Sequence, residues 1–181
     1  WYRPDLQAIA VVGDFDVDQM EKKVKELFSK IPTPVNPAKR ENFTVNPHDE
    51  IYFVCATDKE LTQSSVSVYI KYPAPTKEEK NHQYMKNGIL QSFYNTMLGQ
   101  RVSELLQKGN PPFISAQAGF GGNIVRGWNT YIISTTAKPN EEAGALEAIY
   151  RENERVKKFG FTEGELERAK TNMLVGLESA Y

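Results

Sequence analysis

The stretch PFISAQAGFGGNIVRGWNTYIISTTAKP, residues 112–139, decides the fold class of this 181-residue chain. Two runs rich in β-branched and aromatic residues flank the glycine-rich residues 121–123, which predict a turn between two strands. A connection this short leaves no room for a crossover helix, so the two strands must be antiparallel neighbours. The hairpin therefore favours an α+β fold over one built from parallel βαβ units.

Three further strands are predicted before the hairpin. Residues 6–13 (LQAIAVVG) and 50–57 (EIYFVCAT) are short apolar runs, and residues 64–74 (SSVSVYIKYPA) alternate between apolar and polar side chains. With the hairpin, these patterns predict about five strands in one mainly antiparallel sheet.

Helical spacing of apolar residues predicts the remaining elements. Helices are expected over 17–30, 77–98 and 140–158, with a shorter helix between Gly99 and Gly109 and a last helix from Thr162. The Asp16/Gln19 and Thr162/Glu165 pairs have the spacing of capping boxes. The predicted fold is an α+β two-layer sandwich with the helices packed on one face of the sheet.

We expect residues 1–181 to form a single subdomain. It has a strand–helix opening segment (1–31), a proline-rich connector (32–49) and a ββαα-ββαα core (50–181). Because the chain starts at Trp1 without a methionine and stops at Tyr181 inside a helical pattern, we also expect it to be a segment of a longer protein.

The charge balance excludes some classes of function. The chain has 22 basic and 23 acidic residues, so it lacks the basic surplus that is typical of a nucleic-acid-binding protein. It contains no apolar run long enough to predict a membrane span. The single cysteine, Cys55, follows Ile51, Phe53 and Val54 and is predicted to be a small core residue.

The residues of the chain predict no metal site and no catalytic centre within it. A zinc-binding helix needs two histidines within one turn, whereas His48 and His82 lie on different predicted elements. Arg101 has two interpretations that the residues alone do not decide. It pairs with Glu104 one helical turn away, or it points into a cleft and binds a carbonyl or carboxylate of a peptide.

The opening WYRPDLQAIAVVGDFDVDQMEKKVKELFSKIP (1–32) and the late KFGFTEGELERAKTNML (158–174) carry a family resemblance. Together with the order of the elements between them, they resemble the pitrilysin/insulinase-like zinc proteases, which include mitochondrial processing peptidase and the cytochrome bc1 core proteins. The resemblance covers essentially the whole chain.

In that family, each half of the protease has two similar α/β subdomains, and two halves close around an unfolded peptide. The resemblance implies that this chain is the second, non-zinc subdomain of one half. Its partners would be the preceding zinc-bearing subdomain, the opposite half and the peptide substrate. Zinc is then expected in the parent protein, on an H-x-x-E-H motif that this chain lacks.

The resemblance also bears on substrate contact. Arg101 aligns with an arginine that binds substrate in some family copies, whereas Phe113, near the position of a substrate-binding tyrosine, has no hydroxyl group. This difference implies a supporting subdomain that helps to enclose peptide and is inactive alone. A periplasmic or envelope location is the expectation from relatives.

Two alternatives remain open. The first is a non-catalytic assembly subunit resembling the core proteins of respiratory complexes, and the second is an unrelated α+β binding module.

Overall fold

In the computed structural model, residues 2–41 and 43–180 are described, and the chain divides into two compact units, Trp1–Thr44 and Val45–Tyr181. The first unit contains a 3-10 helix, η1 (Pro4–Leu6), and an α-helix, α1 (Val17–Phe28). The cap predicted at the start of α1 is confirmed, because Asp16 Oδ1 accepts a hydrogen bond from the Gln19 amide at 2.9 Å.

The strand predicted over 6–13 is not formed among the described residues. Its apolar side chains are largely exposed, and Val12 reaches 97% exposure. A strand requires a hydrogen-bonded neighbour and a covered face, and this run has neither within its unit.

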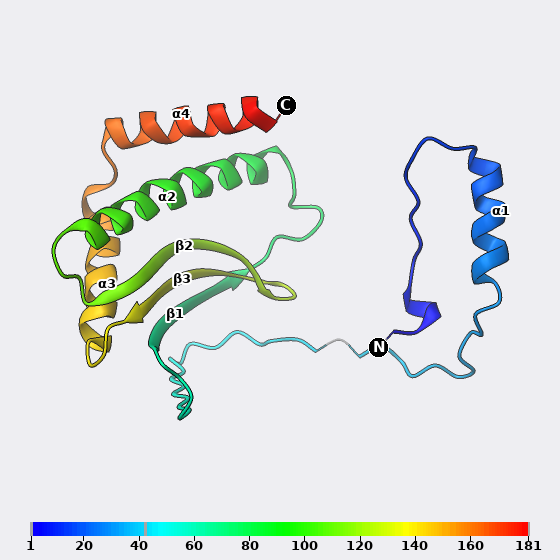
Figure 1. Cartoon of the computed structure of the whole chain (residues 1–181), viewed down its shortest axis with the longest axis horizontal. Coiled ribbons are helices and arrows are strands. Elements are labelled where there is room, and N and C mark those ends of the chain that lie inside the picture. Colours follow the sequence, from blue (N-terminus) through cyan, green and yellow to red (C-terminus); the bar gives the residue numbers. More distant parts are fainter. Residues whose placement is uncertain (1, 42, 181) are drawn as a thin grey trace. The chain divides into compact units, whose positions relative to one another are not determined.

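The second unit is the α+β body of the chain (Figure 1). Its strands form an antiparallel sheet in the order β1-β3-β2. The elements are β1 (Ser64–Pro73), α2 (His82–Gln107), β2 (Phe113–Val125), β3 (Trp128–Ala137), α3 (Glu142–Phe159) and α4 (Glu163–Ala180). The antiparallel α+β class is therefore confirmed. Three strands are seen in the described residues, where about five were predicted.

The hairpin turns at a different place from the one predicted. Strand β2 continues through residues 121–123, and the reversal falls on Arg126 and Gly127, between the paired residues Val125 and Trp128. Gly127 has a φ of +85°, the left-handed conformation that tight hairpin turns require. Register shifts occur instead at Gly121/Asn123, so this glycine-rich stretch forms a bulge in β2.

The predicted strand 50–57 is irregular in the described structure. Phe53 is 88% exposed and Cys55 is exposed as well, so the prediction of a buried cysteine is wrong. The prediction assumed that apolar neighbours imply burial. Here the run makes no ladder with another strand, and its side chains have no face to pack on.

Helix α2 is one continuous helix of 26 residues, not two helices interrupted at Gly99. Leu98 and Val102 are buried on either side of Gly99, and their packing outweighs the roughly 1 kcal/mol that a helical glycine costs. The helix begins at His82 because Asn81 caps it: Asn81 Oδ1 accepts from the amides of Gln83 and Tyr84. The predicted start near residue 77 lies in a turn instead.

The core of the second unit lies between the sheet and helices α2 and α3. Its buried members are Leu98, Val102, Phe113, Ile133, Ala137, Ala145, Ile149 and Val156. Phe113 is 1% exposed, so its ring serves packing. Because α2 and α3 contribute to one cluster with β2 and β3, they hold the hairpin as a rigid platform.

Candidate functional site

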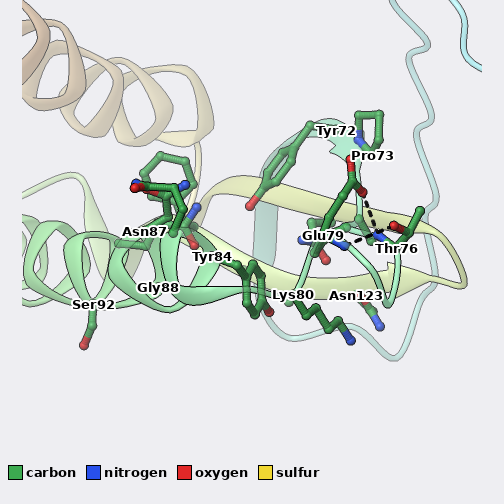
Figure 2. A pocket seen from close by; sticks show the side chains of 18 of the residues that line it. Tyr72, Pro73, Thr76, Glu79, Lys80, Tyr84, Asn87, Gly88, Ser92 and Asn123 are labelled. Atoms are coloured by element: carbon green, nitrogen blue, oxygen red, sulfur yellow. Dashed lines mark hydrogen bonds between the residues drawn. The ribbon is translucent and has the colours of Figure 1, made fainter.

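A polar groove lies between the first half of α2, the loop after β1 and the hairpin end of the sheet (Figure 2). We call it the α2–β2 groove; its volume is about 1170 Å³. Seven of its lining residues carry side-chain amides: Asn81, Gln83, Asn87, Gln91, Asn95, Asn123 and Asn129. The charged lining residues are Glu79 and Lys80, one of each sign. Such a surface offers both donors and acceptors without selecting a charged ligand.

A local turn fixes the mouth of the groove. The Thr76 amide donates to Glu79 Oε2 at 2.8 Å, and the Glu79 amide donates back to Thr76 Oγ1 at 3.4 Å (Figure 2). Hydrogen bonding of the Glu79 carboxylate by the Thr76 amide, and then by its side chain, holds the pKa of Glu79 below its usual range. The carboxylate therefore stays ionised and acts as part of the turn.

Strand β2 lines the groove from Phe120 to Asn123, and the bulge follows directly after Phe120. Asn95, on α2, donates from Nδ2 to the Phe120 carbonyl at 2.8 Å and accepts the Phe120 amide on Oδ1 at 2.8 Å. Gly119 beside it has a φ of +154°, and a Cβ there would lie 2.5 Å from Asn95 Oδ1. The helix thus approaches the free edge of β2 at a position that only glycine permits.

Arg101 does not line the groove, and its side chain is only 13% exposed. Its guanidinium donates to both carboxylate oxygens of Glu165, to Glu152 Oε1 at 3.2 Å and to the Gly160 carbonyl at 3.1 Å. We call Arg101, Glu152 and Glu165 the Arg101 clamp, since it joins α2 to α3 and α4. The pair with Glu104, one of the two interpretations that the sequence left open, is not among the described contacts, because acceptors on α3 and α4 and the Gly160 carbonyl take the guanidinium.

The electrostatics of the clamp follow from these contacts. Hydrogen bonds from Arg101, assisted by those from Thr162, lower the pKa of Glu165 to about 2. The Thr162/Glu165 capping box predicted from sequence is confirmed, with the Thr162 amide 2.7 Å from Glu165 Oε2. One carboxylate therefore caps α4 and also binds α2.

An aromatic cluster, which sequence reasoning missed, links the groove to the clamp. Tyr94 contacts Phe120 and Phe161 with ring centroids 5.2 and 5.5 Å apart, and the Arg101 guanidinium lies 5.0 Å from the Phe161 ring. The Tyr94 hydroxyl lies 2.9 Å from that of Tyr131. Burial and this hydrogen bond raise the pKa of Tyr131, so its phenol remains a neutral hydrogen-bonding group.

The two histidines lie apart from each other and in different surroundings. His48 Nδ1 lies 2.7 Å from the Glu50 carbonyl, with its ring against Tyr52, whereas His82 is the first residue of α2. Across residues 2–41 and 43–180, no group of three or more metal-ligating side chains is found. None of the helices described there is long and apolar enough to cross a membrane.

Comparisons with known proteins agree on one family. The sequence model described as "Peptidase M16 inactive domain" matches residues 1–173. The chain is 23% identical to the Escherichia coli (strain K12) "Probable zinc protease PqqL", over 99% of the chain and 19% of that protein. It is 25% identical to the Arabidopsis thaliana "Zinc protease PQQL-like", over 100% of the chain and 16% of that protein.

Solved structures share the fold. The periplasmic protease PqqL from Escherichia coli superposes with a TM-score of 0.71 at 21% identity, covering 93% of this chain and 18% of that one. The structure of the first half of that protease gives the same TM-score and identity over 36% of its chain. The chain thus spans less than a fifth of the length of these two curated relatives.

Proposed function

The chain belongs to the peptidase M16 family as its inactive domain, and from this premise we propose that it is a supporting subdomain of a zinc metalloendopeptidase. In this proposal the chain is inactive alone and forms part of the wall around a peptide substrate. The observation that carries the proposal is the family match over residues 1–173, and the amide-rich groove in the same chain supports it.

Zinc belongs to the parent protein in this proposal, because the residues of this chain do not fit the ion. Zinc sites use three or four nitrogen, sulfur or carboxylate ligands converging on one point. His48 is stacked on Tyr52, His82 starts α2, and no ligand cluster exists among the described residues. No catalytic step is assigned to this chain.

The α2–β2 groove supports the peptide-binding part of the proposal. Strand β2 is an edge strand, so its outward amide and carbonyl groups can pair with an extended peptide. The amide side chains of Asn87 and Gln91 on the opposite wall have both donors and acceptors for a peptide backbone. Peptide would be held through its backbone and by shape, with little selection for charge.

The exposed apolar residues of the helices support a neighbouring subdomain as partner. Met85, Ile89 and Leu90 on α2 and Leu174 and Leu177 on α4 are all exposed. Exposed apolar residues on two helices are typical of a surface that another protein element covers. We assign this surface to the preceding zinc-bearing subdomain, and the groove side to the chamber closed by the opposite half.

Three further parts of the proposal concern organisation and location. Residues 1–181 form one subdomain in the parent, because one family model runs through both compact units. Residues 6–13 and 50–57 are strands there, which brings the two-layer sandwich to about five strands with its helices on one face. The location is the periplasm or cell envelope, because the Escherichia coli relative is a periplasmic protease.

The substrate-binding role of Arg101 stays a prediction. Its four described hydrogen bonds to Glu152, Glu165 and Gly160 support a structural role in the clamp. A substrate-contacting Arg101 would have to exchange those acceptors for a peptide group.

The test measures the zinc content and the peptidase activity of the chain alone. The same measurements are then made after the zinc-bearing subdomain of the same parent protein is added. We expect no stoichiometric zinc and no cleavage for the chain alone, and cleavage that rises when both subdomains are present. About one equivalent of zinc together with cleavage by the chain alone would refute the proposal. A parent without H-x-x-E-H would instead favour the assembly-subunit alternative.

A further inference from the structure

Strand β2 has one edge paired with β3 and one edge facing the groove. At Phe120 that second edge is already occupied by a side chain. Asn95 and Phe120 exchange two hydrogen bonds of 2.8 Å each, one from the amide of each partner to the carbonyl oxygen of the other. Directly opposed residues of an antiparallel ladder exchange the same two bonds. The Asn95 side chain therefore replaces one residue of a neighbouring strand.

The surroundings of this contact keep it in place. Gly119 makes room for the Asn95 amide, because a Cβ at Gly119 would lie 2.5 Å from Asn95 Oδ1. The Phe120 ring is held against Tyr94 and Tyr131 at centroid distances of 5.2 and 5.1 Å. The backbone of Phe120 is thus fixed from both its edge and its side chain.

The edge beyond Phe120 is different. Residues 121–123 line the groove and carry the bulge, and a Cβ at Gly122 would meet nothing within 4 Å. The residues of β2 that line the groove are Phe120 and residues 121–123. We propose that Asn95 closes the edge of β2 at Phe120, so that a peptide bound in the groove pairs with β2 only within residues 121–123. Asn95 is then a positioning residue that sets the register of the peptide. This inference rests on the proposed peptide-binding function.

The test follows backbone amide hydrogen exchange in the full chain by NMR, with and without a probe peptide. The probe is a capped, uncharged decapeptide of alternating Thr and Gln, and its control is the same peptide with alternate backbone amides methylated. In the unaltered chain we expect slow exchange at Phe120 without peptide. The probe should add protection only within residues 121–123, at amides that do not already bind β3, and the methylated control should add none.

The variant Asn95→Ala removes the side-chain partner. We expect the Phe120 amide to exchange about tenfold faster without peptide and to regain protection when the probe is added, because the peptide now reaches this position. Asn95→Asp keeps an acceptor for the Phe120 amide but loses the donor and sets a carboxylate oxygen against the Phe120 carbonyl, so protection at Phe120 should fall in this variant as well. Gln107→Ala, at the other end of α2 and outside the groove, should leave exchange as in the unaltered chain.

The outcomes separate the two claims. If the probe protects residues 121–123 equally in the unaltered chain and in Asn95→Ala, with no gain at Phe120, peptide binding stands and the register role of Asn95 is wrong. Unchanged Phe120 exchange in Asn95→Ala without peptide contradicts that role as well. If the probe protects neither protein, or the methylated control protects as well as the probe, peptide binding through β2 is itself wrong, and the register role fails with it.

Discussion

Replacing Arg101 by methionine should destabilise the second unit strongly and change its response to acid. Methionine fills a similar volume and removes the cation of the clamp, so that Glu165 loses its cationic partner and Glu152 keeps the more distant Arg155, at 3.6 Å. Glu152 and Glu165 have side chains only 7% and 14% exposed, so little water reaches them in compensation. Removing one partner of a buried ion pair costs about 3–5 kcal/mol. We expect a loss at or just below the low end of that range, because Glu165 keeps its bonds from Thr162.

The pKa of Glu165 gives a second value for the loss of stability in Arg101→Met. It falls from an ordinary value of 4.5 to about 2 in the folded chain. At about 1.4 kcal/mol per pKa unit, this difference corresponds to roughly 3 kcal/mol of stability. Since the folded pKa is the lower one, this stability is present above pH 4.5 and is lost as the pH falls toward 2. In Arg101→Met most of that acid-dependent loss should be absent.

The assay is urea denaturation followed by far-UV circular dichroism at pH 7, 4 and 2.5 for the unaltered chain and Arg101→Met. The matched control is Arg151→Met, because Arg151 pairs with Glu147 on the surface of α3 at 77% exposure and should lose no more than about 0.5 kcal/mol. A loss below about 1 kcal/mol for Arg101→Met at pH 7 would refute the reasoning. An acid response as steep as that of the unaltered chain would also refute it.

Three further substitutions test other contacts by the same denaturation assay. Gly119→Ala should cost about 1–3 kcal/mol of stability, because the φ at this position is +154° and the new Cβ would collide with Asn95. A loss below about 0.5 kcal/mol would contradict the close contact between Asn95 and the backbone of Gly119. Asn81→Ala should cost about 1 kcal/mol, because two amides at the start of α2 lose their acceptor, and unchanged stability would show that another group caps the helix. Tyr131→Phe should cost about 1–2 kcal/mol, because the Tyr94 hydroxyl and Asn153 Oδ1 lose their hydrogen-bond partner. Tyr69→Phe, on an exposed ring, should leave stability unchanged. Equal effects of the two substitutions would contradict the role given to the Tyr131 hydroxyl.

Local chemistry explains which elements could be predicted from the sequence. The cap at Asp16 and the capping box at Thr162/Glu165 depend on residues three positions apart, so the spacing alone predicts them. Strands β1 and β3 follow from alternating or β-branched residues that meet a partner in the same unit. The runs 6–13 and 50–57 have similar composition, but a strand also depends on a neighbour that composition does not specify.

The site was less predictable because its contacts join residues far apart in the chain. Arg101 binds Glu165, and Asn95 binds Phe120, across separations of 64 and 25 residues. For Arg101, the sequence offers Glu104 as a local partner, and only the packing of α4 against α2 reveals the real one. For the hairpin, the sequence offers two glycine-containing stretches as the turn. The turn forms at Gly127, and the stretch with Gly121 and Gly122 forms a bulge instead. The sequence feature that could have indicated the groove is Asn95 on the predicted helix together with the glycine-rich residues 119–122 of the following strand.

Phe120 shows why the groove and the clamp belong to one arrangement. Its backbone meets Asn95 at the edge of the groove, while its ring packs on Tyr94, which in turn packs on Phe161 beneath the Arg101 guanidinium. A chain of packed rings resists displacement better than isolated surface contacts, because any shift must open a gap between aromatic faces. The position of the β2 edge is therefore determined from the core outward. This arrangement suits the proposed role, because a wall that binds peptide through its backbone must hold those backbone groups at a fixed position.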